Sequence, residues 1–289
     1  MIKSDHLMRW LRGDVFISAC DPKNETALEQ LDQRMAEYYK QNTYPQWVHE
    51  VNDQWTAETH QMQLQMCELL PKTGRVLEIG SGKGAGGKEL RKRAQTIEYF
   101  GVDISFTSKL DSHFVCGRAD LLPFVGCSFE AVVSMFVIEH LTHPHLFLDE
   151  AWRVLKPGGY FIILAPDFKQ TAMISQNLGL SFGTGRTKLK ARKWLDAGLT
   201  LFDSRVRSAF LRKKYNQEIH AGRCVFPILL NPRCFDLKEQ NIFEPDCDAI
   251  YWVCPEEVLT HLSAKKDFLK GEIFFRNSHQ FGLYAMKKV

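Results

Sequence analysis

The sequence has no C-x-x-C pair and no regular spacing among its eight cysteines. Disulfide frameworks and structural zinc sites depend on such spacing, so we expect reduced thiols and no metal site. No apolar run approaches the ~20 residues of a membrane-spanning helix, and none near the start is long enough for a signal peptide. These absences predict a cytoplasmic protein without a membrane span.

An excess of charge of one sign is also lacking over the chain as a whole, because the formal net charge is only +3. The charge is unevenly spread, however. The segment 186–214 holds ten basic residues against Asp196 and Asp203, so it carries +8 and the rest of the chain about −5. A basic segment of this kind suits an anionic or acidic partner, although a solvated charged face is its ordinary use.

A glycine-rich turn is the most informative feature that is present. The apolar run 76–79 stops at Gly80, Gly82 and Gly84, and residues 88–91 suit a helix, so the order is strand, tight turn, helix. No Gly-Lys-Ser/Thr follows, which excludes a phosphate loop, and a dinucleotide fingerprint fits only with alanine as its third glycine. The carboxylate of Glu78 would repel a pyrophosphate, so the turn favours a cationic or amino-bearing ligand.

Further apolar runs follow the turn, and polar residues stand at their ends. The run 97–104 ends in Asp103, where nucleotide-binding α/β folds place a carboxylate that accepts hydrogen bonds from ribose. The run 114–116 precedes Asp120, and the run 129–138 ends in Glu139 and His140. Strands that alternate with helices imply a parallel sheet, whose carboxyl ends lie at one edge. These side chains are therefore expected to converge.

Together these segments resemble the class I S-adenosylmethionine-dependent methyltransferases. The similar motifs are EIGSGKG at 78–84, LPF at 122–124, EHL at 139–141 and RVLKPGG at 153–159, the last two characteristic of the branch that acts on small molecules. The resemblance implies a doubly wound, seven-stranded Rossmann-like sheet with S-adenosyl-L-methionine as cofactor. Only sixteen residues separate Asp103 from Asp120, which leaves no room for a full helix there. The implied cofactor contacts are Glu78, Gly80, Ser81, Gly82, Gly84, Asp103, Ile104, Asp120, Leu121 and Glu139.

The rest of the chain is divided around this core. We expect an N-terminal helical segment at 1–70, the cofactor half of the core at 71–166, an inserted basic, partly helical cap at 167–245 and the end of the core at 246–289. The helix that begins near Pro144 is expected to stop at Pro157-Gly158-Gly159. A helix at 255–262 and a strand hairpin at 270–287 are predicted to close the core.

A helical stripe lies inside the insertion. Leu195, Leu199, Phe202, Val206 and Phe210 recur at helical spacing among the basic residues. Such a stripe usually faces the core, but this segment is also where the resembled family often inserts a substrate cap. The sequence favours neither the core-facing helix nor the substrate cap over the other.

Methyl transfer from a sulfonium needs alignment above all, and a base only when the acceptor is a hydroxyl. His140 is the candidate base, although Glu139-His140 could simply shape the pocket. His140, His143 and His145 could in principle hold a metal, but Thr142 also suits the cap of a helix that begins at Pro144. The prediction is a methyltransferase with a small or lipid-like acceptor, for which an acidic group would suit the basic segment, and with oxygen as the favoured atom.

Three alternatives to a small-molecule methyltransferase can be compared with the motifs of the sequence. Nucleic acid is not expected as the acceptor, because the fourth strand lacks the Asn/Asp-Pro-Pro-Tyr/Phe and Pro-Cys motifs of the enzymes that methylate bases. The basic insertion keeps an RNA or other anionic polymer open. A non-catalytic binding protein on the same fold is disfavoured, because without a ligand the strained glycine turn has no purpose. A nicotinamide dehydrogenase is disfavoured by Glu78.

Overall fold

The computed structural model describes residues 16–41, 62, 64–82, 84, 96–104, 113–168, 185–232, 234–235, 247–276 and 281–289. Its centre is a seven-stranded sheet in the order β4-β3-β2-β5-β6-β9-β8, in which β9 runs antiparallel to both neighbours and the other pairs are parallel. This confirms the predicted sheet and its terminal strand pair. The strands are β2 (Gly74–Ile79), β3 (Ile97–Asp103), β4 (Phe114–Cys116), β5 (Phe129–Met135), β6 (Leu155–Pro166), β8 (Phe268–Arg276) and β9 (Phe281–Lys288).

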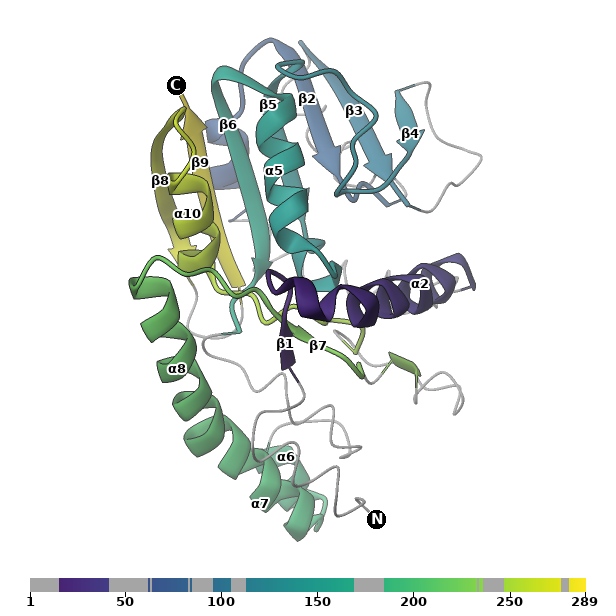
Figure 1. The fold of residues 1–289 in the computed structure, drawn as a ribbon, viewed down its shortest axis with the longest axis vertical. Helices are drawn as coiled ribbons and strands as arrows, with labels where there is room; N and C mark the ends of the chain where they lie inside the picture. Colours follow the sequence, from purple (N-terminus) through teal and green to yellow (C-terminus); the bar gives the residue numbers. More distant parts are fainter. Residues whose placement is uncertain are drawn as a thin grey trace.

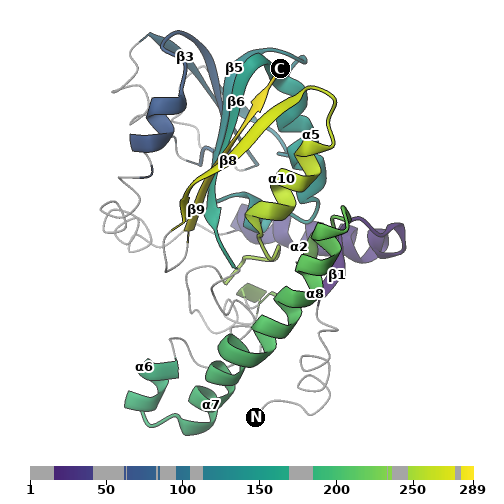
Figure 2. The ribbon, with the colours of Figure 1, turned by 90° about the vertical axis from the view of Figure 1, so that its left-hand side faces the viewer.

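Both faces of the sheet are covered, which explains the nearly continuous apolar runs of its strands. On one face α5 (Pro144–Val154) and α10 (Pro255–Ser263) lie side by side (Figures 1 and 2). On the other face Met62, Met66 and Leu70 pack against Val76 and neighbouring strand residues, with 64–69 helical. Successive residues of a strand point to opposite faces of the sheet, so buried side chains form one apolar layer on each face.

The helix after the fourth core strand ends earlier than predicted. The sequence placed its end at Pro157-Gly158-Gly159, but α5 ends at Val154 and Leu155 is extended, with φ −73° and ψ 133°. Leu155 already pairs with Phe129 in the sheet. Pro157 cannot donate to a helix and disfavours helical geometry at the residue before it, so the chain turns into β6 sooner.

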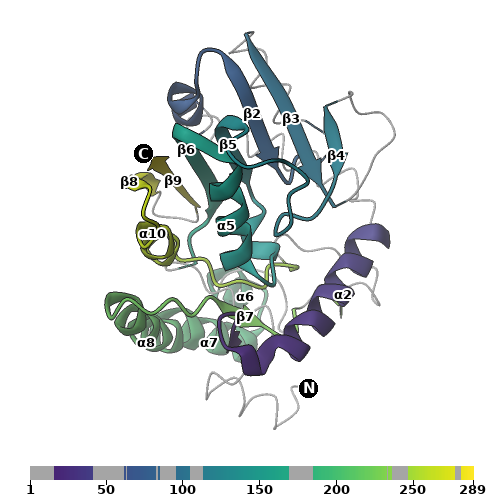
Figure 3. The ribbon, with the colours of Figure 1, turned by 45° about the horizontal axis from the view of Figure 1, so that its top comes forward.

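Helix α2 (Glu25–Gln41) lies across the carboxyl ends of β2, β3 and β4 (Figures 1 and 3) and follows the short turn η1 (Pro22–Asn24). Its apolar face is turned toward the core, because Leu28, Leu31, Met35 and Tyr38 are buried. Asp32 fastens the helix to the core: it accepts from Arg118 at 2.6 Å and from Thr142 at 2.8 Å. Thr142 is therefore not the cap of α5, whose N-cap residue is His143.

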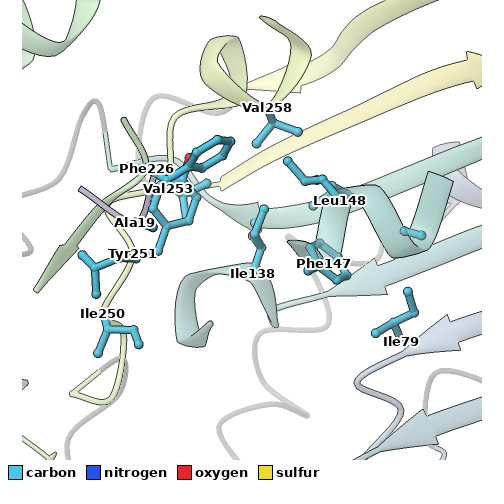
Figure 4. Close-up of a cluster of buried hydrophobic side chains, with 14 of the residues drawn as sticks. Ala19, Ile79, Ile138, Phe147, Leu148, Phe226, Ile250, Tyr251, Val253 and Val258 are labelled. Carbon is cyan, nitrogen blue, oxygen red and sulfur yellow. The ribbon is translucent and has the colours of Figure 1, made fainter. Parts of the chain in front are cut away.

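Two parts of the chain that were predicted as separate are joined by a small sheet. Strand β1 (Phe16–Ser18) pairs antiparallel with β7 (Pro227–Leu229). Figure 4 shows Ala19 and Phe226 in one apolar cluster with Ile138 and Tyr251. Residues 247–253 are buried as expected but form no strand beyond a single bridge from Tyr251 to Ile228. The insertion contains α6 (Gly185–Lys190), α7 (Trp194–Phe202), the π-helical turn η4 (Asp203–Arg207) and α8 (Ser208–His220).

Three features expected from the sequence lie outside the described residues. They are the helix at 88–91, the chain at 105–112 between Asp103 and β4, and the link at 277–280 of the terminal hairpin.

The Asp32 contacts predict how firmly α2 is held. Asp32→Ala removes two hydrogen bonds to a half-exposed carboxylate and is expected to lower the free energy of unfolding by about 1–2 kcal/mol. Urea unfolding measures this change. Glu37→Ala, an exposed position on the same helix, is the matched control. Equal stability of the two variants would mean that α2 is held by its apolar face alone.

Candidate functional site

The glycine turn at the end of β2 is closed on one side and open on the other. Gly80, Gly82 and Gly84 have φ of 75°, 51° and 75°, in the left-handed region that favours glycine. A Cβ built on Gly80 would lie 2.0 Å from Cγ2 of Val137, whereas one on Gly82 would meet no heavy atom of the described residues within 4 Å. The turn therefore packs against the exit of β5 at Gly80 and leaves free space in front of Gly82.

Asp103 lies at the end of β3, next to this turn. Its Oδ2 accepts a hydrogen bond from the backbone N–H of Gly82 at 2.8 Å. The backbone N–H groups of Gly80 and Ser81 both donate to the carbonyl of Val102, at 2.8 and 3.1 Å. These contacts fix the carboxylate beside the open space. Ile104, the following residue, is 38% exposed although it is apolar.

The other predicted residues at this edge already have partners inside the protein. Glu78 is buried and accepts a hydrogen bond from the hydroxyl of Tyr99. Arg118 binds both oxygens of Asp120, through Nε at 2.8 Å and Nη2 at 2.7 Å. Those bonds, together with the one to Asp32 of α2, raise the pKa of the Arg118 guanidinium. Asp120 thus takes part in the attachment of α2, and Leu121 beside it is an apolar side chain that is 71% exposed.

The exit of β5 is bent by a strained residue. Phe136 has φ 56°, a left-handed conformation that side chains other than glycine rarely adopt and that often occurs at functional sites. This bend sets Val137 against Gly80 and begins the short helix η2 (Ile138–His140). Glu139 is fully buried, and its carbonyl accepts from the N–H groups of Ile250 and Tyr251, at 2.7 and 2.9 Å.

His140 is held by a residue that the sequence did not single out. Its Nδ1 lies 3.2 Å from the backbone carbonyl of Asp248 and 3.6 Å from Oδ2 of the same residue. Tyr39 of α2 donates its hydroxyl to that Oδ2 at 2.9 Å and sets its ring edge-on to the imidazole. The other nitrogen, Nε2, lies 3.7 Å from Oε1 of Glu139. The imidazole is thus fixed between two carboxylates, with its side chain 19% exposed.

A second acidic group lies near the end of β6. Asp167 and Tyr284 of β9 are both buried, and the Tyr284 hydroxyl has no hydrogen-bond partner among the described residues. Burial raises the pKa of Tyr284 well above its usual value, and the negative charges of Glu139 and Asp167 add to the effect. No local motif marks Asp167, Tyr284, Asp248 or Tyr39, because only the tertiary fold brings them to the site.

The three neighbouring histidines do not gather at one point. His140 lies next to the carbonyl of Asp248. The ring centroids of His143, the N-cap residue of α5, and of His145, inside α5, lie 6.0 Å apart. Among the described residues no group of three potential metal ligands is found. None of the helices in the same part of the chain is both long and apolar enough to span a membrane.

Comparison with protein families gives one match to this edge and its strands. Residues 77–163 match the family model described as a methyltransferase domain. This range begins inside β2 and ends inside β6, so it contains the glycine turn, Asp103, Asp120 and His140.

Curated relatives match between 30% and 44% of the chain. A fatty-acid O-methyltransferase of Mycolicibacterium smegmatis is 36% identical over 97 residues, 30% of this chain and 35% of the relative. A phthiotriol/phenolphthiotriol dimycocerosates methyltransferase of Mycobacterium tuberculosis is 29% identical over 153 residues, which cover 44% of this chain and 57% of the relative. A demethylmenaquinone methyltransferase of Deinococcus radiodurans is 33% identical over 101 residues, which cover 31% of this chain and 42% of the relative. The matched part thus spans between about a third and somewhat over half of these relatives.

Solved structures show a more distant likeness. A protein of Pyrococcus horikoshii aligns with 81% of this chain and 91% of its own, at 17% identity and a TM-score of 0.48. A methyltransferase of Thermotoga maritima aligns over 84% of this chain and 97% of its own chain, at 18% identity and a TM-score of 0.41.

Proposed function

Because its core belongs to the class I S-adenosylmethionine-dependent methyltransferases, we propose that this protein transfers a methyl group from that cofactor to a lipid-like acceptor. The single observation that carries the proposal is the open space in front of Gly82, bordered by the fixed carboxylate of Asp103. A turn that is strained and yet unfilled is the shape expected of a ligand cradle.

The residues at this edge fit the chemistry of S-adenosylmethionine. Asp103 would accept hydrogen bonds from the ribose hydroxyls, and the exposed apolar side chains of Ile104 and Leu121 would contact the adenine. Asp120 remains the proposed acceptor for the adenine amino group, while Arg118 orients it. Glu78 and Glu139 would set negative charge near the methionine portion. When bound, the cofactor supplies an activated methyl group on a positively charged sulfur.

The acceptor is proposed from the chemistry of the relatives. Those of Mycolicibacterium, Mycobacterium and Deinococcus are named for a fatty acid, a phthiotriol and demethylmenaquinone, which share long apolar chains. These names support a lipid-like acceptor in this chain too. A hydroxyl is the proposed site of methylation, because its proton must be removed by a base and His140 at this edge is the proposed base.

The contacts of His140 suit a general base. If Nδ1 carries the proton and donates it to the carbonyl of Asp248, then Nε2 keeps its lone pair for the proton of the acceptor. The carboxylates of Asp248 and Glu139, at 3.6 and 3.7 Å from the ring nitrogens, would then stabilise the charged imidazole. Tyr39 acts as a positioning residue, since it holds Asp248.

Calorimetry with Asp103→Ala tests the cofactor site. The loss of hydrogen bonds to a charged group is expected to weaken S-adenosylmethionine binding by about 1.5–3 kcal/mol, or roughly ten- to a hundred-fold in Kd. Glu98→Ala is the control, because Glu98 pairs with Arg75 near the opposite end of β3. NAD should bind neither the variants nor the original protein. If the folded protein binds NAD but not S-adenosylmethionine, the proposal fails.

A further inference from the structure

The helices of the insertion expose their apolar side chains and bury charged ones. The stripe predicted as core-facing or cap-lining points outward: Leu195 is 75% exposed, Phe202 42%, Val206 53% and Phe210 70%. Trp194 beside them is 67% exposed. Leu199, the fifth residue of the stripe, is partly buried against the core, so a core-facing interpretation is wrong for the other four. Large apolar side chains gathered on one surface generally mark a contact with another molecule or a membrane.

The inward side of the same helices explains this orientation. Ala197, Thr200 and Leu211 are buried there, together with an ion pair between Arg207 and Asp203 at 2.9 Å. Lys188 of α6 reaches inward as well and donates to Thr200 at 2.9 Å. These bonds give each of the three buried charged side chains a partner on the inward side, which is therefore occupied by polar groups, while the apolar stripe lies on the other side.

Positive charge surrounds the exposed stripe. Asp203 is already paired with Arg207, so Asp196 is the one other acidic residue from 186 to 214. Basic side chains on an amphipathic surface extend toward anionic head groups while aromatic and aliphatic side chains enter the apolar boundary. The exposed basic residues of this surface are Arg186, Lys190, Arg192, Lys193, Arg205 and Lys213.

We propose that this surface, formed by α6, α7, η4 and the first half of α8, binds an anionic lipid bilayer. Such a bilayer is complementary in both respects, since it offers negative head groups above an apolar interior. A second copy of the chain would bring two strongly positive surfaces together. RNA would neutralise the charge but would leave Leu195 and Val206 in water.

The surface is joined to the site by a packed segment. Figures 1 and 2 show α6 and α7 at the end of α8 farthest from the sheet. In the second half of α8, Tyr215 packs edge-on against Trp252, whose indole N–H donates to the carbonyl of Phe168 just beyond β6. Attachment through the exposed stripe would therefore hold the carboxyl edge of the sheet at a set distance from the lipid.

Co-sedimentation with vesicles tests the proposal. Vesicles of phosphatidylcholine and phosphatidylglycerol in equal parts should bind the protein, and vesicles of phosphatidylcholine alone should bind it much less. The double variant L195S/F210S is expected to weaken binding at least about ten-fold, through lost apolar insertion. R205Q/K213Q is expected to weaken it about twenty-five-fold, at about five-fold per cation.

The control variant replaces the same kinds of side chain outside the insertion. K266Q/L269S changes an exposed cation between α10 and β8 and an exposed leucine of β8, and should bind like the original protein. All the substituted side chains are exposed, so folding should persist, which circular dichroism checks. Binding that L195S/F210S does not weaken, binding to single-stranded RNA instead of vesicles, or a dimer that L195S/F210S dissociates would each overturn the proposal. No cofactor is needed, so the outcome is independent of the transferase proposal.

Discussion

Gly82→Ala is expected to fold and to lose most of its affinity for S-adenosylmethionine. Among the residues that the structure describes, the added methyl group meets no atom within 4 Å, so we expect the folded state to bear only the strain of a left-handed alanine, about 1–2 kcal/mol. The same methyl group would occupy the space that the cofactor is proposed to fill, and overpacking of this kind costs about 1–3 kcal/mol. Kd should therefore rise roughly ten- to a hundred-fold.

Gly80→Ala is the matched comparison, two residues away. Its methyl group would lie 2.0 Å from Cγ2 of Val137, so strain and overpacking add up in the fold itself. The free energy of unfolding should fall by about 2–5 kcal/mol. Urea unfolding and calorimetry on both variants separate the two effects. Full cofactor affinity in Gly82→Ala would show that the space in front of this residue is not the cofactor site.

His140→Ala is expected to lower kcat for a hydroxyl acceptor by about 10²–10⁴-fold, because a positioned base contributes that much to proton transfer. A long-chain fatty acid is the informative second acceptor. Its carboxyl group is already ionised at neutral pH, so its methylation needs no base and should be little affected by the substitution. Initial rates with a long-chain alcohol and a long-chain fatty acid, at saturating S-adenosylmethionine, measure the contrast.

Two further variants complete that experiment. Asp248→Asn should lower kcat for the hydroxyl acceptor while the affinity for S-adenosylmethionine stays unchanged, because it removes the negative charge that faces His140 and accepts from Tyr39. His220→Ala removes an exposed imidazole on α8 and serves as the control. If His140→Ala slows both acceptors equally, His140 shapes the pocket and is not the base.

The residues that could be recognised in the sequence are those that end strands. Asp103 and Glu139 follow apolar runs, and parallel strands bring their carboxyl ends to one edge, so local spacing was enough to place them there. Asp248 and Tyr39 could not be found in this way. They are 209 residues apart and meet through a hydrogen bond that only the packing of α2 on the core creates.

The direction of a helical stripe was likewise beyond the sequence. Periodicity predicts that Leu195, Phe202 and Phe210 share a face, but it does not say which face turns inward. The inward face holds the Asp203–Arg207 pair of η4 and Lys188 of α6, and Lys188 reaches its partner Thr200 only after α6 and α7 have packed together.

The pairing of β1 with β7 has a consequence for synthesis on the ribosome. Phe16 aligns with Leu229, so the first strand of the chain waits for more than two hundred further residues before its partner exists. At the usual rate of about 5–20 residues per second, that delay is roughly 10–40 s. During this time Phe16, Leu28 and Leu31, which the finished protein buries, lack part of their final cover. The nascent chain should therefore be a chaperone client until β7 emerges, and the N-terminal segment should be among the last parts to dock.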